Sequence, residues 1–214
     1  VRRLVGSEMC IRDRGNSYHS VWFTLCYCLG GKIMPIVLNG NGTVTGLSQL
    51  PDSAMAAGSI LQVKQTFKTD FFSTTSSSFV DITGMSLEIT PTSTSSKILI
   101  EVIINAGGES NFYGGIKLLR GSTTIGLSTA VSLGNQVNAF FGSFVANGAN
   151  GNVKTGTFGQ KFLDLPSTTS ATTYKLQVYC RNSKEFNLNR NNSNANGAET
   201  VGSTSSITAM EVAA

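Results

Sequence analysis

The sequence of 214 residues is short of charge, histidine and proline. Asp, Glu, Lys and Arg make up only 13% of it, and it has one histidine, one tryptophan and four prolines. Globular domains usually carry about 25% charged residues, and coiled coils are rich in Ala, Glu, Lys, Leu and Arg. The composition therefore excludes a coiled coil and also a tail that is disordered because of its charge. No apolar run reaches the roughly 18 residues of a membrane span, so we expect none.

Charge and unusual residue types gather in the first 33 positions. This segment has five Lys and Arg against two Asp and Glu, whereas residues 34–214 have 11 basic and 10 acidic residues. The formal net charge of +4 is thus +3 in residues 1–33 and +1 in the rest. The rarer side chains of the first segment are Cys10, His19, Trp22, Cys26 and Cys28.

Three interpretations of residues 1–33 compete. The apolar run 21–29 behind a basic start is typical of a secretory signal, but Arg12, Asp13 and Arg14 interrupt it. A metal or redox site from Cys26 and Cys28 rests on a single C-x-C pair, whereas zinc sites usually show two.

The third interpretation is that residues 1–33 are not native protein. Residues 5–14 resemble translated adaptor sequence, and residues 30–34 are compatible with a ribosome-binding site and start codon read in frame. We favour this interpretation and expect the native chain to start at Met34, with residues 1–33 packing poorly on the rest. The nucleotide sequence tests it, because the absence of both signals there would contradict it.

Residues 34–58 read as a short leader or linker. A brief strand at 35–38 is followed by Asn39-Gly40-Asn41-Gly42, a strong turn signal because Asn and Gly tolerate positive φ. We expect residues 43–47 to pair back on the first strand. The segment is too short to bury a core of its own.

From residue 59 the pattern becomes β. Apolar and polar residues alternate over 61–67 and 174–181, and short alternating runs cover 79–82 and 86–89. The stretch 97–104 is nearly continuous apolar sequence and predicts a strand buried on both faces. Further strands are expected at 186–188 and 207–212 and near 112–120, 138–146 and 154–164. Runs of Ser and Thr precede several strands and suit turns. Residues 59–214 are therefore predicted to form an all-β domain, an antiparallel β-sandwich of jelly-roll type.

Little catalytic chemistry is available after residue 34. No histidine remains, which removes Ser-His-Asp and Cys-His catalysis and most zinc sites. Cys180 lies on the apolar face of its strand and is expected to be a buried structural thiol. We therefore predict no catalytic residue, no metal and no cofactor. A pair of carboxylates for glycoside hydrolysis stays open, and its candidates are Asp70, Asp81, Glu88, Glu101, Glu109 and Asp164.

Nucleic-acid binding is also poorly supported, because Lys117 and Arg120 are isolated and no basic run occurs. Two loops remain as candidates for glycan recognition. Asn187–Asn196 is rich in amides, and Gly107–Gly115 carries Phe112 and Tyr113 among glycines. The alternative, that both are ordinary solvated loops, is the better supported of the two.

Stretches of residues 34–214 resemble marine phage structural proteins. The matching stretches are Met34 to Leu47, Leu50-Pro51-Asp52, Gln62 to Gln65, Ile89 to Ile100, Leu165 to Tyr174 and Ser206 to Glu211. This resemblance implies a virion component, made in the host cytoplasm, of tail-fibre or receptor-binding type. It further implies a homotrimer that contacts other virion proteins, with a distal domain similar to C1q or tumour-necrosis-factor jelly rolls.

Three functions follow, in order of preference. The first is a non-enzymatic virion protein that acts through trimeric assembly and host-glycan attachment, where trimerisation raises weak binding about 10²–10⁴-fold. The second is a secreted or surface lectin-like module. The third is a small glycan-degrading enzyme, which needs two inward carboxylates about 5–10 Å apart in a cleft.

Overall fold

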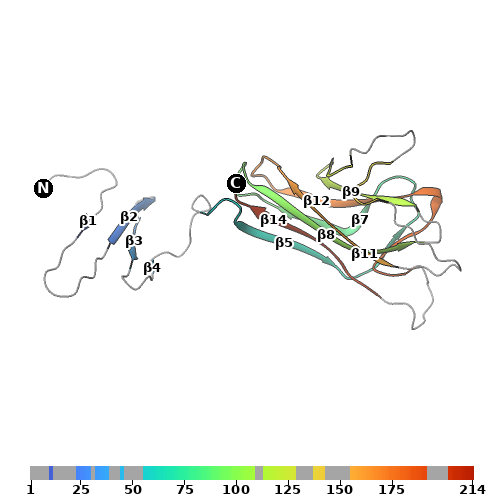
Figure 1. Cartoon of the computed structure of the whole chain (residues 1–214), viewed down its shortest axis with the longest axis horizontal. Helices are drawn as coiled ribbons and strands as arrows, with labels where there is room; N and C mark the ends of the chain where they lie inside the picture. The colour runs from blue at the N-terminus through green and yellow to red at the C-terminus, as the bar shows by residue number, and fades with distance from the viewer. Residues whose placement is uncertain are drawn as a thin grey trace. The chain divides into compact units, whose positions relative to one another are not determined.

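The structure is a computed structural model of the whole chain, shown in Figure 1. It describes residues 55–108, 113–128, 137–142, 155–191 and 202–214, together with the backbone of four strands before residue 46. The chain divides into two compact units, Val1–Met55 and Ala56–Ala214. Each is described by itself.

The first unit contains a small antiparallel sheet. Its strands are β1 (Cys10–Ile11), β2 (Phe23–Leu29), β3 (Lys32–Leu38) and β4 (Val44–Thr45), in that order across the sheet. The predicted pairing of the two strands is confirmed, because Val37 pairs with Thr45 and Leu38 with Val44. The Asn-Gly stretch predicted to form the turn lies outside the described residues. Met34 lies within β3, and the proposed start of the native chain there stays a prediction. The side chains of Cys10, His19, Cys26 and Cys28 lie outside the described residues.

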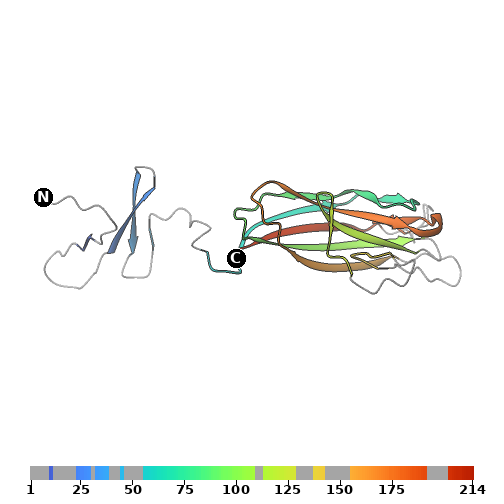
Figure 2. The same ribbon diagram turned by 90° about the horizontal axis from the view of Figure 1, so that it is seen from above.

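The second unit is an antiparallel β-sandwich, as predicted. Figure 2 shows its strands running along one long axis in two layers. Its elements are β5 (Ile60–Lys68), β6 (Phe72–Thr74), β7 (Val80–Ile89), β8 (Lys97–Gly108), β9 (Gly114–Arg120), β10 (Thr123–Ile125), β11 (Gly156–Asp164), β12 (Thr172–Cys180), the 3-10 turn Arg181–Ser183, β13 (Phe186–Leu188) and β14 (Ser205–Val212). β5 covers the alternating run predicted at 61–67 and extends one residue beyond it at each end.

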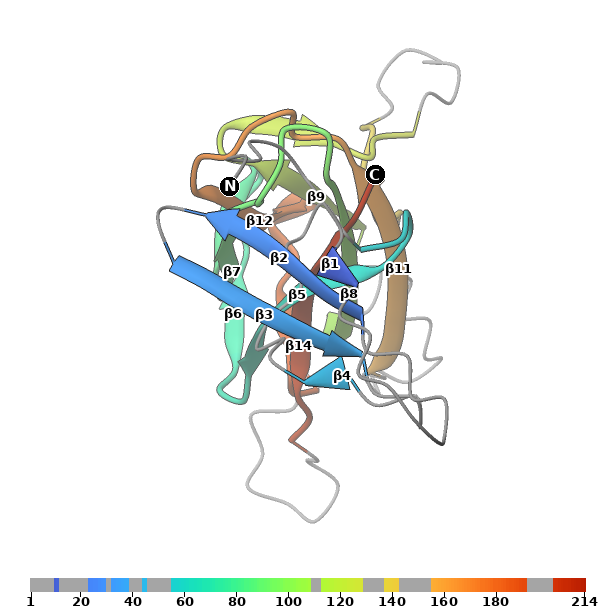
Figure 3. The same cartoon turned by 90° about the vertical axis from the view of Figure 1, so that its left-hand side faces the viewer.

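The order of the strands is that of a jelly roll. One sheet has the order β10-β9-β12-β7. In the other, β8 lies between β14 and β11, β5 pairs with the far side of β14, and the short β13 and β6 extend it. Numbered along the chain, the eight main strands thus form the sheets 1-8-3-6 and 2-7-4-5, which are two interlocked Greek keys. Viewed along the strands in Figure 3, β9 and β12 lie in one layer and β5 and β14 in the other.

The core lies between the two sheets and follows the period of two that strands impose. On β12 the alternation predicted from the sequence is confirmed, because its inward side chains are fully buried. The central members of the core are Ile98, Ile100, Val102, Ile104, Ile116, Leu118, Tyr174, Leu176, Val178, Phe186 and Ile207.

Two local predictions were wrong. The stretch 97–104 is buried on one face only, because Leu99 is half-buried and Ile103 is 39% exposed. An antiparallel sheet covers its core face and leaves the other outward. The runs 79–82 and 86–89 form the single strand β7, because a bulge opposite Lys175 and Gln177 absorbs the extra residues. Gly84 lies in this bulge with φ +81°, a backbone conformation that glycine adopts without strain.

Candidate functional site

The candidate carboxylates for glycoside hydrolysis do not converge. Asp81 lies on the outer face of the four-stranded sheet, where it pairs with Lys175 at 2.8 Å, and Glu88 is exposed on the same strand. Glu101 lies on the outer face of the other sheet, and Asp164 points into the core between them. Asp70 is exposed and pairs with Lys68. Glu109 is outside the described residues.

Asp164 belongs to a buried network that joins the two sheets. The Tyr174 hydroxyl donates to Asp164 at 2.6 Å, and the Arg120 guanidinium donates to both carboxylate oxygens at 2.9 and 3.0 Å. Burial, together with the neighbouring Asp164 carboxylate, raises the pKa of Tyr174 well above its usual range, so the phenol stays a donor. The network links β11 to β9 and β12. Its role is therefore to position the sheets rather than to react.

Glu211 is a second buried carboxylate, and sequence reasoning missed it. It is fully buried and faces inward from β14, where it accepts hydrogen bonds from Gln62 Nε2 at 2.6 Å and from the Thr92 amide and hydroxyl at 2.7 Å each. Burial alone would raise the pKa of Glu211, but hydrogen bonds from Gln62, Ser96 and Thr92 outweigh it and lower the pKa. Glu211 therefore ties the turn between β7 and β8 to the C-terminal strand.

The buried Glu211 predicts a stability that falls in acid. A carboxylate whose folded pKa is lowered stabilises the fold fully above its ordinary pKa of 4.5, and this contribution is lost as the pH falls through the lowered value. Glu211→Gln removes the charge, so we expect a loss of about 1–3 kcal/mol at neutral pH and a flatter decline below pH 4.5. Denaturant unfolding across the pH range measures both. The matched control is Glu88→Gln at an exposed site, and an equally steep decline in E211Q would contradict the assignment.

Cys180 is buried, as the sequence predicts. Its thiol donates to the Thr74 carbonyl at 3.3 Å, and burial raises its pKa to about 11. A thiol with a raised pKa forms little of the reactive thiolate at neutral pH. Among the residues that the structure describes, no group of three or more His, Cys, Asp or Glu side chains is arranged to hold a metal ion.

The predicted glycan loops are described only in part, and the described asparagines are structural. Asn187 and Asn189 are buried. The Asn189 amide donates to the carbonyls of Lys68 at 3.0 Å and Asp70 at 2.9 Å and accepts from Ser205 at 2.6 Å. These amides are therefore not available on the surface. In the other loop, Tyr113 is exposed, while Phe112 is outside the described residues.

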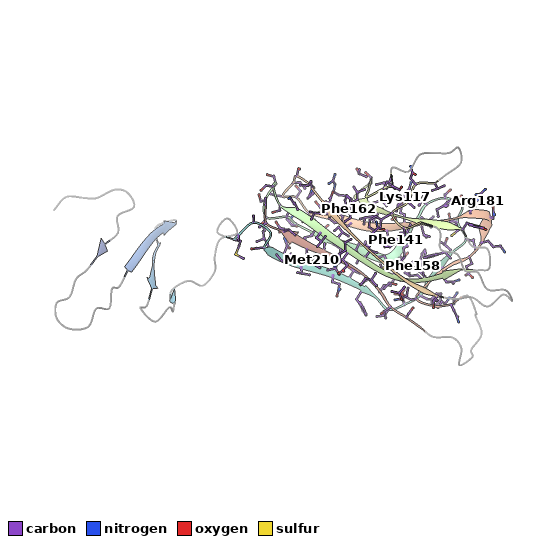
Figure 4. All side chains as sticks on the ribbon, in the orientation of Figure 1. Lys117, Phe141, Phe158, Phe162, Arg181 and Met210 are labelled. Atoms are coloured by element: carbon purple, nitrogen blue, oxygen red, sulfur yellow. The ribbon has the colours of Figure 1, made fainter. Side chains whose placement is uncertain are left out.

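The outer face of the four-stranded sheet is polar. Asp81, Lys175 and Gln177 form a hydrogen-bonded cluster on it. The Lys117 ammonium lies 3.9 Å from the centre of the Phe79 ring, which packs beside Tyr179. Figure 4 labels Lys117 on this side of the sandwich. Such a face is typical of solvated antiparallel sheets.

The outer face of the other sheet carries exposed apolar side chains, and β5 shows this most clearly. Its inward positions hold polar side chains, Gln62, Lys64, Thr66 and Lys68, as their register with β14 establishes. Its outward positions hold Val63, 56% exposed, and Phe67, 60% exposed. This arrangement is the reverse of the usual apolar-in, polar-out pattern. It places the larger apolar side chains of the strand where water would meet them.

Register places these outward side chains in three rows across four strands, which we call the outward rows. The strands are β5, β14, β8 and β11, in that order, and Met210 marks β14 in Figure 4. The central row is polar: Gln65 donates to Thr208 at 2.9 Å, and Lys161 pairs with Glu101 at 2.9 Å. In strand order, the three rows are Val63, Met210, Leu99, Leu163; Gln65, Thr208, Glu101, Lys161; and Phe67, Ser206, Ile103, Gly159.

Isolated exposed apolar residues are normal, but a contiguous apolar patch marks an interaction surface. Leu163 is 46% exposed, and Ile60 and Leu165 add exposed apolar side chains beyond the first row. Sequence analysis predicted the alternation of β5 without indicating which face lies inward. This surface is the best candidate functional site on the described residues.

Comparison with known proteins gives matches among solved structures and none among family models or curated proteins. Among solved structures, the VP2 subviral particle of infectious bursal disease virus is similar, with a TM-score of 0.32 and 13% identity over 72% of this chain. The match covers 37% of the VP2 chain. In the described part of the chain, no helix has the length and apolar character needed to cross a membrane.

Proposed function

We propose that the protein is a virion structural component that works as an assembly of several copies, without catalysis. The observation that carries the proposal is the set of exposed apolar side chains in the first and third outward rows, on either side of the polar central row. On β5 Val63 and Phe67 point away from the core, while the opposite side of the strand carries polar side chains, of which Lys68 is buried. A strand patterned in this way is more stable when a second protein surface covers its outward side.

The tail-fibre or receptor-binding type, the homotrimer and the attachment to host glycans rest on the resemblance to marine phage structural proteins. The proposed location is the virion, and the proposed partners are further copies and other virion proteins. Assembly would multiply weak contacts with a host surface by effective concentration, about 10²–10⁴-fold for linked sites. Low charge and a surface rich in Ser, Thr and Gly suit such a particle component.

Gene neighbourhood tests the virion assignment. We expect the assembled genomic segment that encodes this chain to carry capsid, portal or baseplate genes beside it. A neighbourhood of secretion or surface-protein genes would favour the lectin-like module instead, and a neighbourhood of metabolic genes would contradict both. The same nucleotide sequence settles whether Met34 is the start codon.

A further inference from the structure

The outward rows are complementary to a second copy of the same face. Consider two copies related by a 180° rotation about an axis that runs parallel to the strands, between β14 and β8. This rotation places β5 of one copy opposite β11 of the other, and β14 opposite β8. Each row of one copy therefore faces the same row of the other copy in reverse strand order. In the third row this places Phe67 opposite Gly159 and Ile103 opposite Ser206 of the second copy. Each large side chain of one copy thus lies opposite a glycine or a serine of the other, so that large and small residues are complementary.

The other two rows also match when reversed. In the first row all four residues are apolar, so Val63 meets Leu163 and Met210 meets Leu99. In the central row Lys161 meets Gln65 and Glu101 meets Thr208, so no like charges oppose each other. The central row has one acidic and one basic side chain and therefore no net charge. It is compatible with a second copy of the same row and has no charge complementary to a strongly charged partner.

The size of the face reaches the lower limit for a specific contact. Four strands about 4.8 Å apart and four rows about 6.8 Å apart, counting the row of Ile60 and Leu165, cover roughly 500 Å² per copy. Two copies then bury about 1,000 Å² in total, which is the area that a biological interface should reach. A two-fold rotation along the strands keeps the two sheets aligned, which is one of the two common ways in which sheets pack face to face.

We infer that two copies of this chain pack the outward rows of their β5-β14-β8-β11 sheets against each other about a two-fold axis. The inference rests on the proposed assembly and specifies one contact within it. This contact joins copies two by two. If the chain also forms a trimer through other surfaces, the contact would join two trimers into a complex of six copies.

Charge exchange at the edges of the face tests this register. Val63 and Leu163 lie on strands at opposite edges of one sheet. In the two-fold contact, Val63 of each copy nevertheless faces Leu163 of the other copy. The variant Val63→Lys/Leu163→Lys therefore opposes like charges at two places, and we expect association of the full chain to weaken about a hundredfold or more. The variant Val63→Lys/Leu163→Glu places unlike charges opposite each other. We expect its copies to associate at least about tenfold more tightly than those of the double-lysine variant.

Two exposed apolar residues outside the rows provide the control. Leu127→Lys/Val137→Lys adds the same charge, and we expect it to leave association unchanged. Sedimentation equilibrium gives both the affinity and the number of copies. Two or six copies, with recovery by the exchanged charges, support the two-fold contact.

Other outcomes separate this inference from the proposed assembly. Three copies without recovery overturn the two-fold contact and leave the assembly intact. Monomers at all concentrations overturn both.

Discussion

Asp164→Ala is expected to destabilise the second unit by about 2–4 kcal/mol, because its partner Tyr174 is buried while its partner Arg120 is 30% exposed and keeps part of its hydration. The substitution takes the acceptor from the Tyr174 hydroxyl and the counter-charge from Arg120. A buried donor that loses its partner costs about 1–3 kcal/mol by itself. Chemical denaturation of the full chain, followed by circular dichroism, measures the loss.

Asp81→Ala is the matched control for this prediction. Asp81 pairs with Lys175 at 2.8 Å on the outer face, where water screens the charges, so its loss should cost less than about 1 kcal/mol. In a Tyr174→Phe background, Asp164→Ala should cost about 1–2 kcal/mol less than in the native chain, because the two side chains share one hydrogen bond. Equal costs for D164A and D81A would show that the network does not join the sheets.

Two phenylalanine truncations should separate the core from the assembly face. Phe186→Ala is expected to cost about 3–5 kcal/mol, because Phe186 is fully buried between the sheets and the cavity left behind adds to the lost transfer energy. Phe67→Ala removes the same ring from a position that is 60% exposed. We expect it to change the unfolding free energy of the dissociated chain by less than about 0.5 kcal/mol.

The two truncations should have the opposite order of effects on the affinity between copies. Phe67→Ala should weaken binding between copies, because the ring is removed from the third outward row, while any effect of F186A on association should follow from loss of folding. Unfolding must be measured at a concentration where the copies are apart, since association adds to apparent stability. If F67A destabilises the dissociated chain as much as F186A does, the ring is part of the core and the outward assignment of β5 is wrong.

Much of the fold follows from the sequence because period-two alternation is a local signal. On β12, Tyr174, Leu176, Val178 and Cys180 lie on one face, and all four are buried. The pairing of β3 with β4 likewise follows from a local signal, the Asn and Gly residues between the two strands. These features depend on neighbours along the chain, so they can be predicted without the topology.

The assembly face could not be predicted in this way, because alternation does not show which side of a strand faces the core. On β5 the apolar side lies outward, and only its pairing with β14 makes this visible. Glu211 escaped notice for a related reason. Its acceptor role depends on Gln62 and Thr92, which are more than a hundred residues away in sequence. The nearly continuous apolar run 97–104 led to the wrong prediction of a strand buried on both faces. Its side chains alternate between the core and the outer face of the sheet.

The mass of the full chain in solution, measured over a range of concentrations, tests the central claim most directly. One copy has a mass of 22.6 kDa. We predict a multiple of this mass at micromolar concentration, and a shift toward the single-copy mass when Val63 and Leu163 are both replaced by lysine. A chain that stays at 22.6 kDa at every concentration, with Val63 and Phe67 open to solvent, would contradict the account.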